Sequence, residues 1–240
     1  MEGHKDSDSS ITLLKDCKGV IKMINIERIK NKSVPAIIGL IILGIIALVL
    51  IFQVGCFIVG MVIFAGDIFL SKKHVNTDIQ EYTKYVGANA ADEYKSKWGM
   101  DESIWPDKIT DNMDVEDFKM VYYNPWDAQY LGYLVVNYAD EDYAKEVERL
   151  QNYNSTEYVG YYGVTGEEDY ELLAVYADPY YGFVYALTDG KEKIIYAEEI
   201  FCNYYMDLKY KKYIPKEYLL DGFDASENNP YRKEQMKEMQ

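Results

Sequence analysis

Tyrosine is the residue type in this sequence best suited to contacting a ligand. All 25 tyrosines and all three tryptophans lie between Tyr82 and Tyr231. Their side chains combine a flat apolar face with one hydrogen-bonding group, which suits both sugar rings and protein partners. Neighbours in a strand point to opposite faces, so adjacent tyrosines predict one buried and one exposed ring. The alternative is that tyrosine serves mainly as a strand former. The predicted binding surface consists of Trp126, Tyr161, Tyr180 and Tyr181.

Histidine and cysteine are too scarce for most catalytic machinery. The two histidines, His4 and His74, are predicted to lie outside the folded domain, which excludes Ser-His-Asp and Cys-His catalysis and histidine-rich metal sites. Cys17, Cys56 and Cys202 fall in three separate segments, so no disulfide is expected within the domain. Cys202, at the end of a predicted strand, is interpreted as a buried structural thiol. No phosphate-binding glycine loop is present, and neither a cofactor nor a metal is expected.

Carboxylates are the catalytic groups that remain in quantity. Residues 67–240 hold 35 acidic and 18 basic residues, a net charge of −17. This charge repels phosphate groups and argues against nucleic acid as a partner. Glycoside hydrolysis needs two carboxylates at a set separation, and among so many acids some pair always fits. A cell-envelope hydrolase is therefore one alternative function, but the sequence names no catalytic residue.

One uncharged run determines how these residues are positioned. Residues 34–66 carry no charge, and Gln53 is their one strongly polar side chain. Such a run predicts a transmembrane helix over residues 34–66, with an extension to residue 70 as the alternative boundary. The run is longer than the core of a cleaved signal peptide, so an uncleaved signal anchor is preferred. Lipidation at Cys56 is a weaker alternative, because Gln53 occupies a position where an aliphatic residue is usual.

Charge next to the run predicts its orientation. The leader, residues 1–33, carries six basic residues between Ile11 and Ser33 against Asp16 and Glu27. Basic residues beside a span stay in the cytoplasm, so we expect a cytoplasmic N-terminus and an extracytoplasmic C-terminal domain in a single-pass cell-membrane protein. The leader also shows the apolar spacing of an amphipathic helix on the inner leaflet, although a merely solvated leader explains it equally well.

The remaining sequence predicts one acidic, tyrosine-rich α+β domain over residues 76–224. A stalk over 67–75 precedes it, and a polar tail over 225–240 follows. Helical spacing runs through 78–98, and a second helix, capped by Asp140, spans about 140–152 with a Glu141–Lys145 pair. The Asp189-Gly190 dipeptide between two alternating runs indicates a hairpin. We expect an antiparallel sheet of five or six strands with about two helices, the strands lying at 118–123, 129–138, 157–164, 170–177, 181–188 and 192–200.

The preferred function is that of a non-enzymatic binding protein. Membrane lipid would surround residues 34–66, and a protein or cell-wall component would contact the tyrosine-rich sheet face. A third possibility is a structural subunit whose span is the interface within a membrane complex. In layout the chain resembles many bacterial surface proteins, and the scarcity of cysteine outside the membrane favours a bacterial source. That resemblance covers layout alone and assigns no site residues.

Overall fold

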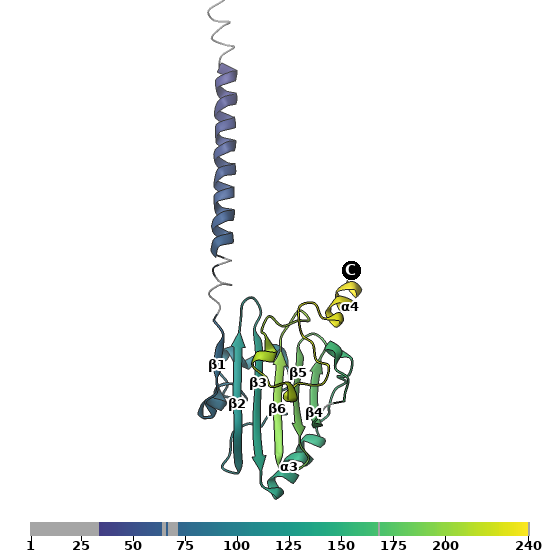
Figure 1. Ribbon diagram of the computed structural model, residues 1–240. Coiled ribbons are helices and arrows are strands. Elements are labelled where there is room, and N and C mark those ends of the chain that lie inside the picture. The colour runs from purple at the N-terminus through teal and green to yellow at the C-terminus, as the bar shows by residue number, and fades with distance from the viewer. Residues whose placement is uncertain (1–33, 64–65, 67–71, 168, 240) are drawn as a thin grey trace, which may run out of the picture. The chain divides into compact units, whose positions relative to one another are not determined.

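The computed structural model describes residues 34–63, 66, 72–167 and 169–239 of the protein (Figure 1). It divides into two compact units, Met1–Gly66 and Asp67–Gln240. The interpretation of the leader as an amphipathic helix, and the extension of the apolar run to residue 70, fall outside the described residues.

The first unit contains one apolar helix, described over Val34–Ile63. Its 30 residues rise about 45 Å, more than the ~30 Å of a bilayer's hydrocarbon core. Pro35 stands near its start, where the missing N–H is tolerated. The helix has the length and composition of a membrane anchor or a signal sequence.

The second unit is built on a six-stranded antiparallel sheet with the order β1-β2-β3-β6-β5-β4. The α+β class and the antiparallel sheet are thereby confirmed. Strand β3 begins and ends where the sequence predicted, and β4, β5 and β6 lie within one residue of their predicted bounds. The strands are β1 His74–Asn76, β2 Met113–Tyr123, β3 Gln129–Tyr138, β4 Glu171–Asp178, β5 Gly182–Thr188 and β6 Lys193–Ile200.

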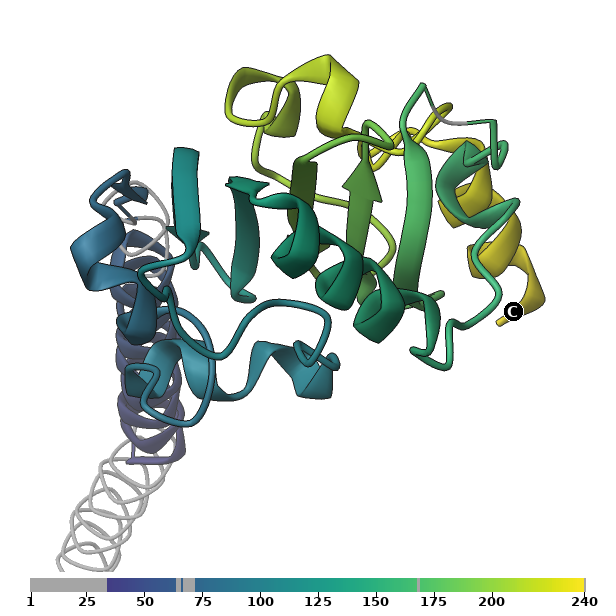
Figure 2. The same cartoon turned by 90° about the horizontal axis from the view of Figure 1, so that it is seen from below.

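Both faces of the sheet are covered, as Figure 2 shows from below. Alternate residues of the central strands enter two separate cores: Tyr196 packs in one and Ala197 in the other. The first core is closed by η1 Ile79–Lys84, α2 Asp92–Lys95, η2 Lys97–Gly99 and α3 Asp140–Gln151. The second is closed by η3 Tyr161–Gly163, η4 Tyr210–Lys212, η5 Lys216–Tyr218 and their connecting segments.

Three local predictions were wrong. The strand predicted at 157–164 is instead a loop with the turn η3, because Gly160 and Gly163 adopt φ of 89° and 83° and break extended backbone. The spacing at 78–98 produced the short η1 and α2, separated by Gly87 with φ of 80°. In α3 the N-cap is Ala139, not Asp140, and Lys145 pairs with Asp142, not Glu141.

The domain also takes in residues outside its predicted limits. His74–Asn76, placed by the sequence in the stalk, form edge strand β1. In the polar tail, α4 (Pro230–Glu238) begins at Asn229, whose side chain accepts a hydrogen bond from the N–H of Arg232 at 2.7 Å. Asn229 itself is buried, which ties the helix to the domain.

Two neighbouring glutamates of β6 are buried on opposite faces of the sheet. Burial raises the pKa of Glu198 to about 7 although Lys97 Nζ lies 2.8 Å from both carboxylate oxygens. Glu102 completes this buried group by a second contact to Lys97. In the other core, burial raises the pKa of Glu199 well above its usual range, opposed by a hydrogen bond from Tyr185 at 2.9 Å. Burial of this kind favours the protonated form of a carboxyl.

The outer edge of β4 is closed by side chains. Ser155 Oγ accepts from the N–H of Val175 at 3.1 Å, and Thr156 Oγ1 accepts from the N–H of Ala177 at 2.7 Å. The N–H of Thr156 donates to the carbonyl of Val175 at 3.0 Å. Backbone groups of Val175 and Ala177, which an edge strand would expose, are therefore paired.

Candidate functional site

A pocket lies at the end of the sheet where β2 passes into β3. Strands β3 and β6 are antiparallel, with Tyr130 opposite Ile200, so the residues before β3 meet those after β6. The pocket has a volume of about 220 Å³ and is lined by Trp126, Asp127, Gln129, Cys202, Asn203, Tyr205 and Asp207. Segments about 75 residues apart in the chain thus build one site.

A strained turn forms one wall of the pocket. Cys202 and Tyr205 make an isolated antiparallel bridge around Asn203 and Tyr204, whose φ angles are 61° and 63°. Positive φ at both central residues is the pattern of a type I′ turn, normally built with Asn-Gly. Asn tolerates this conformation, but a tyrosine there costs about 1–3 kcal/mol. The surrounding contacts must offset that cost.

Two side-chain amides hold the two carboxylates of the pocket. Asn203 Nδ2 donates to Asp127 Oδ2 at 2.8 Å, while Asn203 Oδ1 accepts from the hydroxyl of Tyr180 at 2.7 Å. The buried Gln129 donates to Asp207 Oδ2 at 2.7 Å and accepts the N–H of Leu208 at 3.1 Å. These bonds fix a polar wall of alternating amide and carboxylate groups.

Aromatic side chains supply the apolar part of the site. Trp126 is 52% exposed on the loop between β2 and β3. Tyr205 is half-buried, and the guanidinium of Arg232 lies 4.2 Å from the centre of its ring. A large exposed ring beside hydrogen-bonding groups is a combination that sugars and polar peptide segments both use.

The four predicted site residues lie at this end of the domain but in different roles. Trp126 lines the pocket, and Tyr180 supports it through Asn203. Tyr181 stacks on Trp98 with 5.9 Å between ring centres, and Tyr161 packs at 5.7 Å against Tyr231. Tyr204 joins these contacts, with its ring 4.8 Å from Tyr180 and 6.4 Å from Tyr231.

In the described part of the domain, the tyrosines at the centre of the sheet are buried on both faces. Tyr133, Tyr185 and Tyr196 are at most 2% exposed, because segments cover both faces. The part of the expected surface that remains accessible is the sheet's end. Sequence reasoning did not find Asp127, Gln129, Asn203, Tyr205 or Asp207. The one local signal was the turn-forming Asn203 directly after a predicted strand.

His74 must be corrected as well. It lies within the sheet, in β1 opposite Tyr122, so the domain does contain a histidine. The hollow beside it is lined by Val75, Asn76, Asp78, Glu81, Tyr85 and Tyr94, which include no serine, threonine or cysteine nucleophile. His74 therefore does not complete a nucleophilic triad there.

Cys202 fits the structural thiol that the sequence predicted. It is 8% exposed and forms no disulfide. Burial, together with the neighbouring Asp127 carboxylate, raises the pKa of the Cys202 thiol to about 12. A thiol held protonated is a poor nucleophile and a poor metal ligand. Within the described ranges, no group of three or more His, Cys, Asp or Glu side chains could hold a metal ion.

Comparison with protein-family models, with curated proteins and with solved structures found no match. The function is therefore argued from the geometry of this pocket and from the apolar helix.

Proposed function

We propose that this protein is a single-pass, membrane-anchored binding protein whose pocket takes a sugar ring of a cell-envelope polymer. The anchor comprises residues 34–66, with the N-terminus cytoplasmic and the folded domain extracytoplasmic. The uncharged helix and the basic leader support this arrangement.

The pocket's composition is the observation that carries the proposal. Trp126 and Tyr205 offer aromatic surface, and Asp127, Asn203 and Asp207 offer hydrogen-bond donors and acceptors. Its volume of about 220 Å³ lies below the ~300–1,000 Å³ usual for drug-sized ligands, so one small ring suits it. A protein partner would need roughly 800 Å² of surface per partner, far more than this pocket supplies.

Substitution of Trp126 tests the binding role. In the full chain, solubilised in detergent, Trp126→Ala should weaken binding of envelope glycan fragments at least about tenfold, the cost of one stacking contact. Trp126→Phe keeps a smaller flat ring and should bind with intermediate affinity. Calorimetric titration measures both, and thermal unfolding checks that each variant is folded. If Trp126→Ala bound the glycan fragments with wild-type affinity, the proposal would be wrong.

A carboxylate hydrolase is the second candidate, because the same pocket contains Asp127 and Asp207. The binding proposal expects the wild-type protein to release no reducing ends from envelope glycans. If it does release them, and both Asp127→Asn and Asp207→Asn abolish the release, hydrolysis is the function. The assay uses the same fragments as the titration, so binding and cleavage are compared on one ligand.

The anchor is tested separately from the pocket. The mass of the mature protein should equal that of the uncleaved chain, and the protein should float with membranes after an alkaline wash. Protease added to intact cells should remove the domain while leaving the leader protected. A shortened, freely soluble mature form would identify residues 34–66 as a cleaved signal.

A further inference from the structure

One segment of this acidic domain has the opposite charge. Residues 209–216, Lys-Tyr-Lys-Lys-Tyr-Ile-Pro-Lys, contain four lysines and no acidic residue. We call them the lysine-rich segment. They stand out because residues 67–240 together have a net charge of −17.

The lysine-rich segment is anchored by its apolar residues and presents its cations to solvent. Tyr210 and Ile214 are buried in the second core. Between them, Lys211 and Lys212 lie with Nζ 5.6 Å from the rings of Tyr210 and Tyr213. All four lysines are exposed, and in the described part of the chain none of them forms an ion pair. Lys211 and Lys216 share a hollow with Asp169, Glu217, Asp221 and Asp224 but form no ion pair with them. The lysines therefore remain available for an external anion.

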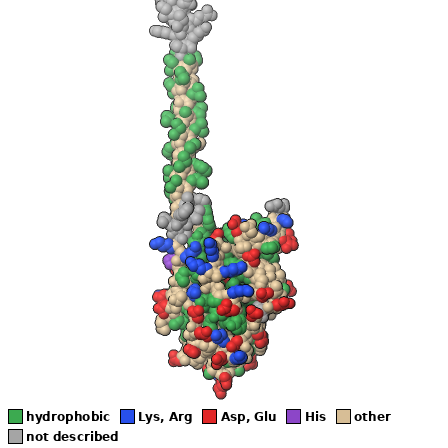
Figure 3. Space-filling model, in the orientation of Figure 1, with side chains coloured by type: hydrophobic (Ala, Val, Ile, Leu, Met, Phe, Trp, Pro, Cys, Tyr) green, Lys and Arg blue, Asp and Glu red, His purple; other side chains and the backbone are tan. Residues whose placement is uncertain are grey.

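The segment runs over the part of the sheet nearer the pocket. It starts next to Leu208, whose N–H bonds Gln129 at the beginning of β3, and the carbonyl of Tyr213 accepts from Lys119 of β2 at 3.4 Å. Figure 3 shows Lys and Arg side chains gathered on the half of this face that carries His74, while Asp and Glu surround the opposite end. On the face that this view shows, basic side chains therefore lie mainly toward the end that carries His74.

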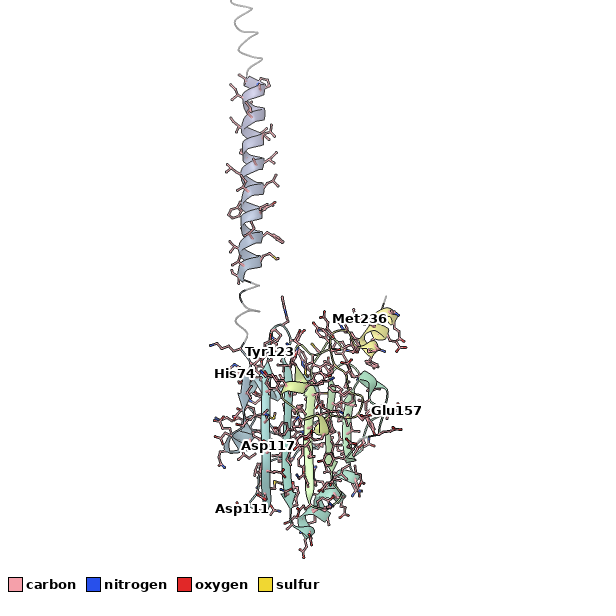
Figure 4. All side chains as sticks on the ribbon, in the orientation of Figure 1. His74, Asp111, Asp117, Tyr123, Glu157 and Met236 are labelled. Carbon is pink, nitrogen blue, oxygen red and sulfur yellow. The ribbon has the colours of Figure 1, made fainter. Side chains whose placement is uncertain are left out.

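The chain enters the domain at the same end. β1 begins at His74, opposite Tyr122 near the end of β2, and Lys72 and Lys73 come directly before it. Figure 4 places His74, Tyr123 and Met236 at this end and Asp111 at the other. Residues 64–73 alone separate Ile63 of the apolar helix from β1, a tether of at most about 40 Å when fully extended.

We propose that the lysine-rich segment docks the domain onto anionic lipid headgroups of the extracytoplasmic leaflet, which faces the domain in the proposed orientation. This inference rests on the proposed membrane anchor. Each lysine near an anionic surface contributes roughly 1 kcal/mol, and the short tether makes the contact intramolecular, so four cations suffice to favour it. The acidic end is repelled by the same surface, which fixes the orientation. The pocket then opens near the headgroup layer.

Chemical labelling of lysines in nanodiscs tests this docking with the full chain. Acetylation of Lys209, Lys211 and Lys212, read by mass spectrometry, should slow several-fold in discs of mixed anionic and zwitterionic lipid relative to purely zwitterionic discs. High salt should restore the rate, because it screens headgroup charge. Lys108, Lys145 and Lys191, which are exposed lysines of the opposite end, should label equally in both discs. Equal labelling of the lysine-rich segment in both discs would overturn the proposal.

Matched variants identify the residues responsible. Energy transfer from the domain's three tryptophans to a headgroup dye should fall to the zwitterionic level in Lys209→Gln/Lys211→Gln/Lys212→Gln. It should persist in Lys108→Gln/Lys145→Gln/Lys191→Gln, which changes the net charge equally. An equal loss in both variants would overturn the assignment. So would protection of the segment by a soluble anionic polymer but not by anionic discs. Failure of the anchor would appear separately, as a protein that does not enter zwitterionic discs.

Discussion

Two turns at opposite ends of the sheet are built in different ways. The β5–β6 turn at Asp189-Gly190 follows standard turn chemistry: Gly190 takes the positive φ, and Asp189 Oδ1 accepts from the N–H groups of Lys191, Glu192 and Lys193. The turn at Asn203-Tyr204, beside the pocket, has no glycine although both central residues have positive φ. One turn is determined by its own sequence and the other by its surroundings.

This difference shows that backbone strain lies at the pocket end of the sheet. The Asn203-Tyr204 turn is held by contacts from Asp127 and Tyr180, which belong to two other loops. Departures from local rules concentrate at functional sites, where the surrounding structure compensates for them. The contrast therefore supports the pocket end, and not the Asp189-Gly190 end, as the place where ligand is bound.

The largest effect expected from this contrast is on two glycines. A Cβ at Gly182, the first residue of β5, would lie 2.0 Å from the carbonyl oxygen of Glu199. Gly182→Ala should therefore destabilise the domain by roughly 3 kcal/mol or more. At Gly190 nothing lies within 4 Å, so Gly190→Ala should cost only about 1–2 kcal/mol from its positive φ of 74°. Urea unfolding compares the two; equal costs would mean that the pocket end is no more tightly packed.

A carboxyl near each turn should respond to pH in opposite ways. Burial acts to raise the pKa of Asp189, but hydrogen bonds from three backbone N–H groups lower it below its usual value. The stability that ionised Asp189 gives the domain is therefore present at neutral pH and lost on acidification. The pKa of Glu199 is raised, so its contribution is present below about 4.5, the value of an ordinary glutamate, and lost as pH rises toward the folded-state pKa. Glu199→Gln should therefore gain stability over the wild-type protein by about 1.4 kcal/mol per pH unit above 4.5.

Unfolding free energies from pH 4 to 8 provide this measurement. The Glu198 charge also raises the pKa of Glu199, so the same difference is measured in a Glu198→Gln background as well. A difference that does not change with pH would show that Glu199 is ionised in the folded domain.

The smallest effect concerns the strained tyrosine itself. Tyr204→Ala loses the ring contacts to Tyr180 and Tyr231 and keeps the unfavourable φ. Tyr204→Gly loses the same contacts but removes the backbone strain, because glycine adopts a positive φ freely. The glycine variant should therefore be more stable than the alanine variant by about 1 kcal/mol, although glycine is normally the less stabilising residue. Thermal unfolding of the pair tests this order, and a more stable alanine variant would show that the turn is not strained.

The sequence predicted the parts of this fold that depend on short-range patterns. Alternation placed Gln129–Tyr138 as β3, and Asp189-Gly190 gave the hairpin that joins β5 and β6. The prediction of a strand at 157–164 was wrong, because the alternating tyrosines resemble a strand pattern but two glycines in the segment adopt positive φ. Of the pocket, only Trp126 was named. Its partners at 202–207 become neighbours through the pairing of β3 with β6, which no local pattern encodes.

The closed edge of β4 affects whether two copies of this protein can pair edge to edge. Copies held in one plane by the proposed anchor would meet often, and an open strand edge would let their sheets join into fibres. Ser155 and Thr156 remove that possibility at one side. At the other, β1 covers only Met120–Tyr122 of β2, and the rest of that strand carries a bulge and the like-charged Asp114, Glu116 and Asp117. Under the proposed anchoring, both edges of the sheet therefore disfavour edge-to-edge pairing between copies.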